Sequence, residues 1–281
     1  MSMTRRWARH WLRSCREFPV RALAVLDRRE GDPGRTIHEF RRLMKAWRAL
    51  LKLAPAELAE EGKAVRGAIG GLRRGFGIAR DTAVVAKVLS ALCPDHTSED
   101  DAQDAAAALL AEQADAVRDE LRHLSAEMAR WSVSDETGDF LVRAFRRSYR
   151  RARRQARRDP RRMDAEHLHD WRSMIVDLSY QLSFFAPADP AGLGQQAKAA
   201  ERLRSRLGNA IDLGMVRAHL AERPALDGVD ALAQEIPRKI AKQRRKAAKL
   251  AKRLLARRPR RAGADLREAM EHRPPRRTSF G

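Results

Sequence analysis

Apolar side chains recur every three or four residues along most of this chain, the spacing that places them on one face of an α-helix. The pattern predicts helices over residues 4–28, 36–54, 105–131, 139–158, 164–187, 195–220 and 227–258, and an interrupted helical stretch over residues 56–92. We find no run of alternating β-branched residues of the kind that predicts a β-strand. The sequence therefore indicates an all-α fold.

The segment from Thr36 to Pro55 has the clearest two-sided pattern. Thr36 and Glu39 have the spacing of a capping box, which predicts that the helix begins at Thr36. On a helical wheel one arc is apolar and contains Ile37, Phe40, Leu43, Met44, Trp47, Leu50, Leu51 and Ala54. A narrow basic stripe at the edge of that arc contains His38, Arg41, Lys45, Arg48 and Lys52. This stripe is either a solvated basic face or the wall of a groove that suits a long polyanion.

Part of this segment recurs 131 residues later, and a second pair of segments has the same offset. The matched positions include His38 and His169, Arg41 and Arg172, and Asp81 and Asp212. One offset shared by two separate segments indicates an internal duplication.

The duplication divides the chain into three predicted parts. The first helical bundle covers residues 4–131, and the second covers residues 135–258. Residues 259–281 include Pro274 and Pro275, and we expect them to form a disordered basic tail.

These residues resemble those of the CHAD family, the conserved-histidine α-helical domain. A His-x-x-Arg-x-x-x-Lys-x-x-Arg motif begins at His38, and a Gly-x-x-Arg-Asp segment runs from Gly77 to Asp81. The second round, at residues 168–182, is similar to the family pattern LHxWRxxxxDLxYQL. The resemblance covers roughly residues 5–258.

The resemblance implies two antiparallel four-helix bundles related by a pseudo-twofold axis, with a basic groove or cavity that binds inorganic polyphosphate. The second round carries Val176, Ser179 and Ile211 where the first has bases, so the two halves of such a site would be unequal. The expected polyphosphate-binding residues are His38, Arg41, Arg42, Lys45, Arg48, Arg73, Arg74, Arg80, Arg143, Arg147, Arg150, Arg154, His169, Arg172 and Arg204.

The helix over residues 139–158 carries a row of arginines at helical spacing beside an apolar face. Our hypothesis is that this helix supplies the positive wall that the second histidine helix has lost. Arg9, Arg13 and Arg16 lie at helical spacing in the first predicted helix and could add to the basic wall of the groove.

The charge of the chain points to a polyanionic partner. Lys and Arg number 58 against 37 Asp and Glu, which gives a formal net charge of +21. Nucleic acid, an acidic membrane and polyphosphate all fit this balance. Thirteen Lys or Arg residues and no acid lie between Arg238 and Arg261, which indicates either a solvated face or a nonspecific polyanion arm.

The sequence shows no catalytic signature. There is no HExxH, no Ser/His/Asp or Cys/His pattern and no paired acidic cluster, so we expect a noncatalytic protein without a metal or cofactor. Only Cys15 and Cys93 are present, and no apolar run is long enough to span a bilayer. We therefore expect a cytoplasmic protein, associated with polyphosphate granules if the resemblance holds.

Two other functions remain open. A nonspecific nucleic-acid-binding protein would share the charge, but the basic stripes lack interleaved aromatic residues for stacking on bases. An accessory component of polyphosphate-metabolising enzymes would share the ligand.

Overall fold

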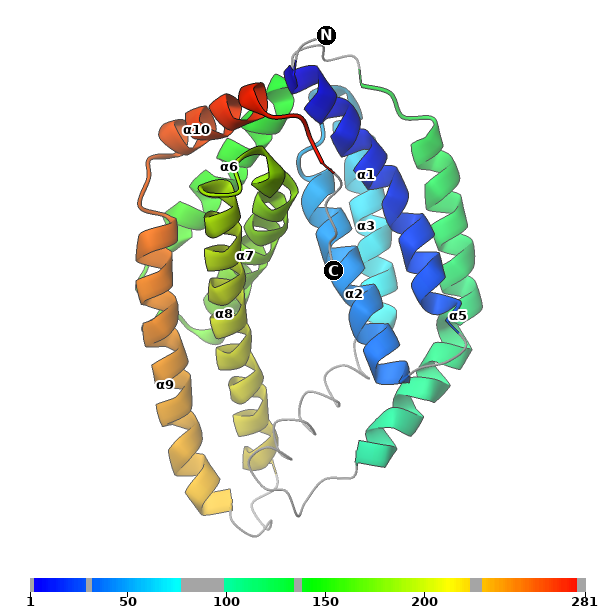
Figure 1. The fold of residues 1–281 in the computed structure, drawn as a ribbon. Coiled ribbons are helices and arrows are strands. Elements are labelled where there is room, and N and C mark those ends of the chain that lie inside the picture. Colours follow the sequence, from blue (N-terminus) through cyan, green and yellow to red (C-terminus); the bar gives the residue numbers. More distant parts are fainter. Residues whose placement is uncertain (1–2, 29–31, 77–98, 134–137, 223–228, 277–281) are drawn as a thin grey trace.

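Figure 1 shows the computed structural model of the chain, which describes residues 3–28, 32–76, 99–133, 138–222 and 229–276. All regular structure in these residues is helical, which confirms the predicted all-α class. The α-helices are α1 (Met3–Leu26), α2 (Pro33–Leu51), α3 (Ala59–Gly75), α5 (Glu99–Ala129), α6 (Asp139–Gln155), α7 (Ala165–Phe185), α8 (Leu193–Ala221), α9 (Val229–Leu254) and α10 (Pro259–His272). Short 3-10 helices occupy Ala56–Leu58 (η1) and Ala186–Ala188 (η3).

Helix α2 begins earlier than the sequence analysis predicted. Its N-cap is Asp32, whose carboxylate accepts a hydrogen bond of 2.8 Å from a backbone N–H of the first turn. Pro33 follows at the first helical position, where a missing N–H costs nothing. Thr36 therefore lies one turn inside the helix, and Glu39 pairs with Arg28 at 2.7 Å. The predicted capping box is wrong because the Asp-Pro pair is the stronger start signal.

The predicted apolar faces form the core. Trp7, Trp11 and Phe18 of α1 are buried, and the indole N–H of Trp11 donates to the backbone carbonyl of Leu50 at 2.9 Å. One contiguous set of buried apolar side chains includes residues from every described α-helix. Burial of these large side chains is the main force that holds the helices together.

The described helices pack in two groups that follow the order of the chain (Figure 1). Helices α1, α2, α3 and α5 pack on one another, whereas α6 packs on α7, α7 on α8 and α8 on α9. The groups meet where α2 packs against α7. At this contact the buried Gln181 side chain donates to the Ala49 carbonyl at 2.9 Å.

The predicted disordered tail is wrong for residues 259–272, which form α10. Pro259 occupies the first turn, and Ala262, Leu266 and Met270 are buried at helical spacing against α6 and α1. An ion pair of 2.6 Å joins Arg267 to Asp139 at the start of α6. The helical spacing of these three small or apolar residues gives α10 one side that can be buried, and this explains why the segment folds as a helix in spite of its charge.

No helix within the described ranges is both long and apolar enough to cross a lipid bilayer.

Candidate functional site

Four arginines from three helices come together near the contact of α2 with α7, and we call them the arginine cluster: Arg41 and Arg48 of α2, Arg73 of α3 and Arg172 of α7. The guanidinium of Arg41 donates to the backbone carbonyl of Arg73. The pKa of Arg73 is lowered to about 10, mainly by burial and in addition by the positive charges of Arg48, Arg41 and Arg172. Arg73 still carries its full charge near neutral pH. The cluster therefore concentrates like charges in a partly desolvated place.

Arg66 of α3 extends the cluster, although the sequence analysis did not select it. Its pKa is lowered by burial and by the charge of Arg48, and its guanidinium donates to the backbone carbonyl of Leu51 at 3.2 Å. Arg66 and Arg73 are seven residues apart and so lie on one face of α3. That spacing is the signal that would have found Arg66.

Asp177 of α7 is an acidic residue whose charge acts on two of these arginines. Its charge raises the pKa of both Arg66 and Arg73, and its carboxylate pairs with Lys52 of α2. The ion pair occupies Lys52, the last residue of the predicted basic stripe. One carboxylate does not neutralise the surrounding arginines, so the local charge stays strongly positive.

Several N–H groups of the site are short of acceptors. Among the described residues, the buried Nε atoms of Arg42, Arg48 and Arg73 have no hydrogen-bond partner. Leaving a buried donor unsatisfied costs roughly 1–3 kcal/mol. A bound anion with several oxygens would remove this cost.

A second set of basic residues lies where α7 packs on α8. The Arg204 guanidinium lies over the Tyr180 ring, 5.0 Å from its centroid, and pairs with Glu201. Burial raises the pKa of Tyr180, and the charges of Arg204 and Arg42 oppose that rise. The guanidinium of Arg172 lies directly over Gly208 of α8, where the absence of a side chain leaves room for it.

The remaining predicted residues of the two matched rounds are less closely involved. His38 and His169 are exposed in the second turns of α2 and α7, and Arg74 is exposed near the end of α3. Lys45 is half-buried on α2 between Arg41 and Arg48. Arg80 lies outside the described residues, so the structure does not place it.

The arginine row of α6 forms a group of its own. Burial lowers the pKa of Arg147, and the largest charge effects on it come from four other arginines of α6, of which Arg143 is the strongest. Arg150 and Arg154 are exposed. The charges with the largest effect on Arg73 come from α2 and α7 instead. The arginine row of α6 and the arginine cluster are therefore two separate groups of charges.

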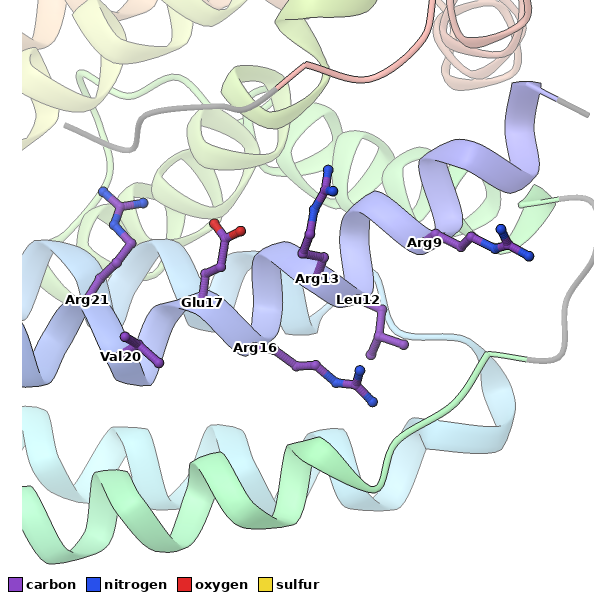
Figure 2. A pocket seen from close by; sticks show the side chains of 7 residues that line it. All are labelled: Arg9, Leu12, Arg13, Arg16, Glu17, Val20 and Arg21. Atoms are coloured by element: carbon purple, nitrogen blue, oxygen red, sulfur yellow. The ribbon is translucent and has the colours of Figure 1, made fainter.

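Helix α1 carries a separate open hollow of about 520 Å³, shown in Figure 2. Arg13, Glu17 and Arg21 project on one side of α1, and Arg16 projects on the other (Figure 2). Arg16 donates to the carbonyls of Met128 and Ala129 at the end of α5, at 2.9 and 2.8 Å. Arg16 is thus engaged in holding α5 to α1, which argues against the expectation that it adds to a common basic wall.

The description "CHAD domain" belongs to a protein-family model that matches residues 19–221 of this chain. No curated protein and no solved structure matches the chain.

Proposed function

Because the chain belongs to the CHAD domain family, which is associated with polyphosphate-related proteins, we propose that it binds inorganic polyphosphate without catalysing a reaction. The observation that carries this proposal is the arginine cluster, in which the guanidinium of Arg41 donates to the Arg73 carbonyl and the charges of Arg48, Arg41 and Arg172 add to burial in lowering the pKa of Arg73.

The physics of the cluster favours a polyanion over a single small anion. Each guanidinium presents several N–H donors in a planar fork that matches phosphate oxygens. Each phosphate unit of the polymer carries negative charge, so one chain would neutralise several arginines in succession and satisfy the orphaned Nε donors of Arg48 and Arg73. Binding then releases counterions and weakens steeply as salt is added.

We place this site in a groove between two pseudo-twofold-related four-helix bundles, residues 4–131 and 135–258. The support is that the matched helices α2 and α7 pack directly against each other, as equivalent helices beside a twofold axis would. The two halves of the site would contribute unequally, since α7 supplies Arg172 but has Val176 and Ser179 at positions where α2 has bases.

The arginine row of α6 is proposed as a second contact surface for the same polymer. A chain longer than the arginine cluster would have room to reach Arg147, Arg150 and Arg154. Replacing these three with Gln should weaken polyphosphate binding more than replacing Arg172 alone. The reverse order would contradict a role for α6.

In the cell, such binding would recruit the protein to cytoplasmic polyphosphate granules. An accessory role beside polyphosphate-metabolising enzymes is compatible with the same site. Release of phosphate from polyphosphate by the purified protein alone would contradict the noncatalytic part of the proposal.

The first experiment is a titration of the purified protein with long-chain polyphosphate at fixed salt, with duplex DNA of equal phosphate concentration in parallel. The variant Arg41→Gln, Arg48→Gln, Arg73→Gln removes three charges of the cluster. Losing three phosphate contacts should weaken polyphosphate binding at least tenfold and flatten its dependence on salt by roughly one logarithmic unit per contact.

A matched control removes the same charge elsewhere. Lys63→Gln, Arg122→Gln, Arg130→Gln also lowers the net charge by three, at exposed positions of α3, α5 and the segment after it. This control should bind polyphosphate nearly as well as the unmodified protein. Equal losses in the two variants would show that net charge alone governs binding, and the proposed site would be wrong.

A further inference from the structure

Helix α9 carries a second strongly basic surface, which we call the α9 basic face: Lys242, Arg245, Lys246, Lys249, Lys252 and Arg253. We propose that this face docks on the phosphate backbone of double-stranded nucleic acid, as a site separate from the arginine cluster.

The α9 basic face points away from the rest of the protein. Helix α9 packs mainly on α8, burying Ala247, Ala251 and Leu254, and it lies at the edge of the molecule in Figure 1. All six basic side chains are exposed. At about 100° per residue they cover roughly 120° of the helix surface, over a length of about 16 Å. The result is a broad convex face, not a narrow line of charge.

None of the six basic side chains forms an ion pair with another described residue. No Asp or Glu occurs in the sequence from Arg238 to Arg261. The acids nearest in sequence are engaged elsewhere, because Asp265 pairs with Arg257 and Arg261, and Glu235 pairs with Lys239 at 3.0 Å.

Arg244 shows what an engaged arginine of the same helix looks like. It is partly buried, and its guanidinium donates to the Met163 carbonyl at 2.8 Å. The six residues of the α9 basic face have no such inward bond among the described residues. They are free to meet an external anion.

The shape and composition of the face favour a duplex over other polyanions. The major groove of B-DNA is about 12 Å wide and admits an α-helix, so a convex face can reach the phosphates on both of its sides. No Phe, Tyr or Trp occurs between Val229 and Arg276, so this part of the chain lacks the large aromatic side chains on which the bases of single strands stack.

A membrane surface fits less well, because the apolar side of α9 is already buried against α8. A helix that lies in a bilayer interface needs that side to contact lipid. The α9 basic face would therefore contact nucleic acid through the phosphates alone, and such contacts do not depend on the nucleotide sequence.

This inference does not rest on the family assignment or on the proposed polyphosphate site. The family match ends at residue 221, before α9 begins. The arginine cluster lies on α2, α3 and α7, none of which is the main packing partner of α9.

The test measures the binding of the full chain to a fluorescent duplex DNA of random sequence, to single-stranded DNA of the same length and to long-chain polyphosphate, over a series of salt concentrations. The variant is Arg245→Gln, Lys249→Gln, Arg253→Gln, and the control is again Lys63→Gln, Arg122→Gln, Arg130→Gln. Both sets remove one Lys and two Arg charges, and circular dichroism verifies that helix content is kept.

We expect the α9 variant to bind duplex DNA at least tenfold more weakly and to reduce the logarithmic salt slope by close to three, at about 0.9 per lost phosphate contact. The control should keep duplex binding, and the α9 variant should keep polyphosphate binding. Equal loss of polyphosphate binding, equal loss in the control, or tighter binding of single strands than of duplex would each overturn the proposal.

Discussion

The arginine cluster places positive charges in a partly buried environment beside other positive charges, and both conditions disfavour the charged form of arginine. Arg73 is the clearest case, since burial and three neighbouring arginines all lower its pKa, and its Nε lacks an acceptor among the described residues. A protein selected only for stability would place an apolar residue there. The position of Arg73 therefore supports the proposed polyphosphate site.

Arg73→Met should accordingly separate stability from binding. Removing the partly buried charge relieves repulsion from Arg48 and Arg41, so the free energy of unfolding without ligand should rise by up to about 1 kcal/mol. Polyphosphate binding should weaken in the same variant. Urea denaturation with and without polyphosphate measures both effects.

The exposed neighbour provides the reference for this comparison. Arg74→Met should change the free energy of unfolding by less than about 0.5 kcal/mol. Loss of stability in Arg73→Met would mean that Arg73 serves the fold, contrary to our interpretation.

His10 predicts a dependence of stability on pH. It is buried, its ring stacks on Phe184 with centroids 5.2 Å apart, and it lies edge-on to Trp7. Burial, and to a smaller extent the charge of Arg13, lowers its pKa from 6.5 to about 4. Between those pH values the unfolded chain binds a proton that the folded chain does not. The contribution of His10 to stability is therefore complete above pH 6.5 and is lost as the pH falls towards 4.

The free energy of unfolding should fall by up to about 2 kcal/mol between pH 7 and pH 5 through His10 alone. His10→Phe keeps an aromatic ring against Phe184 and removes the titrating group. The variant should lose that part of the pH dependence, measured by urea denaturation at both pH values. Identical pH dependence in the two proteins would show that His10 does not titrate as its surroundings imply.

At the scale of the helices, the ends depend on a few residues whose backbone geometry is restrictive. Gly138 precedes α6 with a φ of 66°, in the left-handed region that favours glycine. A Cβ atom at this position would lie 2.3 Å from the carbonyl oxygen of Thr4 in α1. Gly138 therefore determines how closely α6 can approach the start of the chain.

Gly138→Ala should lower the free energy of unfolding by roughly 1–3 kcal/mol, because it combines backbone strain with a steric overlap against backbone atoms. Gly214→Ala in α8 is the natural comparison. No described atom outside the helix's own backbone lies within 4 Å of a Cβ added there, and alanine favours the helix by up to about 1 kcal/mol. Thermal denaturation should show opposite shifts, and a shift of the same sign in both would contradict this account.

Helix α10 has a larger part in the whole molecule than its sequence suggests, because it contacts α1 near the beginning of the chain and α6 in its middle (Figure 1). The indole N–H of Trp7 donates to the Arg273 carbonyl at 3.0 Å, just after α10 ends. Helix α10 and the residue that follows it are thus packed against α1.

Leu266→Ala tests this packing. Leu266 is fully buried, so the substitution should cost about 2–5 kcal/mol of unfolding free energy. The exposed Glu268→Ala on the same helix should change stability by less than about 0.5 kcal/mol. If the two variants were equally stable, α10 would not be a packed part of the fold.

The sequence alone determined what depends on local periodicity and on charge. The positions of most helices, the burial of Phe40, Leu43 and Trp47, and the all-α class follow from the spacing of apolar residues, which is a property of neighbours in the chain. The candidacy of Arg41, Arg48, Arg73 and Arg172 followed from motif and offset. Two local signals misled the prediction. The capping-box spacing placed the start of α2 too late, and the prolines and charge of residues 259–281 hid the helix that part of this segment forms.

Only the tertiary structure decided which charges act together. Arg66 belongs to the site because α3 packs on α2. Arg16 binds carbonyl groups at the end of α5. Helix α10 is stable because its apolar side packs on α6 and α1. Desolvation and Coulomb interactions depend on distance in space, and residues far apart in sequence become neighbours only when helices pack. For that reason the sequence could identify the basic residues of this protein, while the packing of its helices separated the arginine cluster from the α9 basic face.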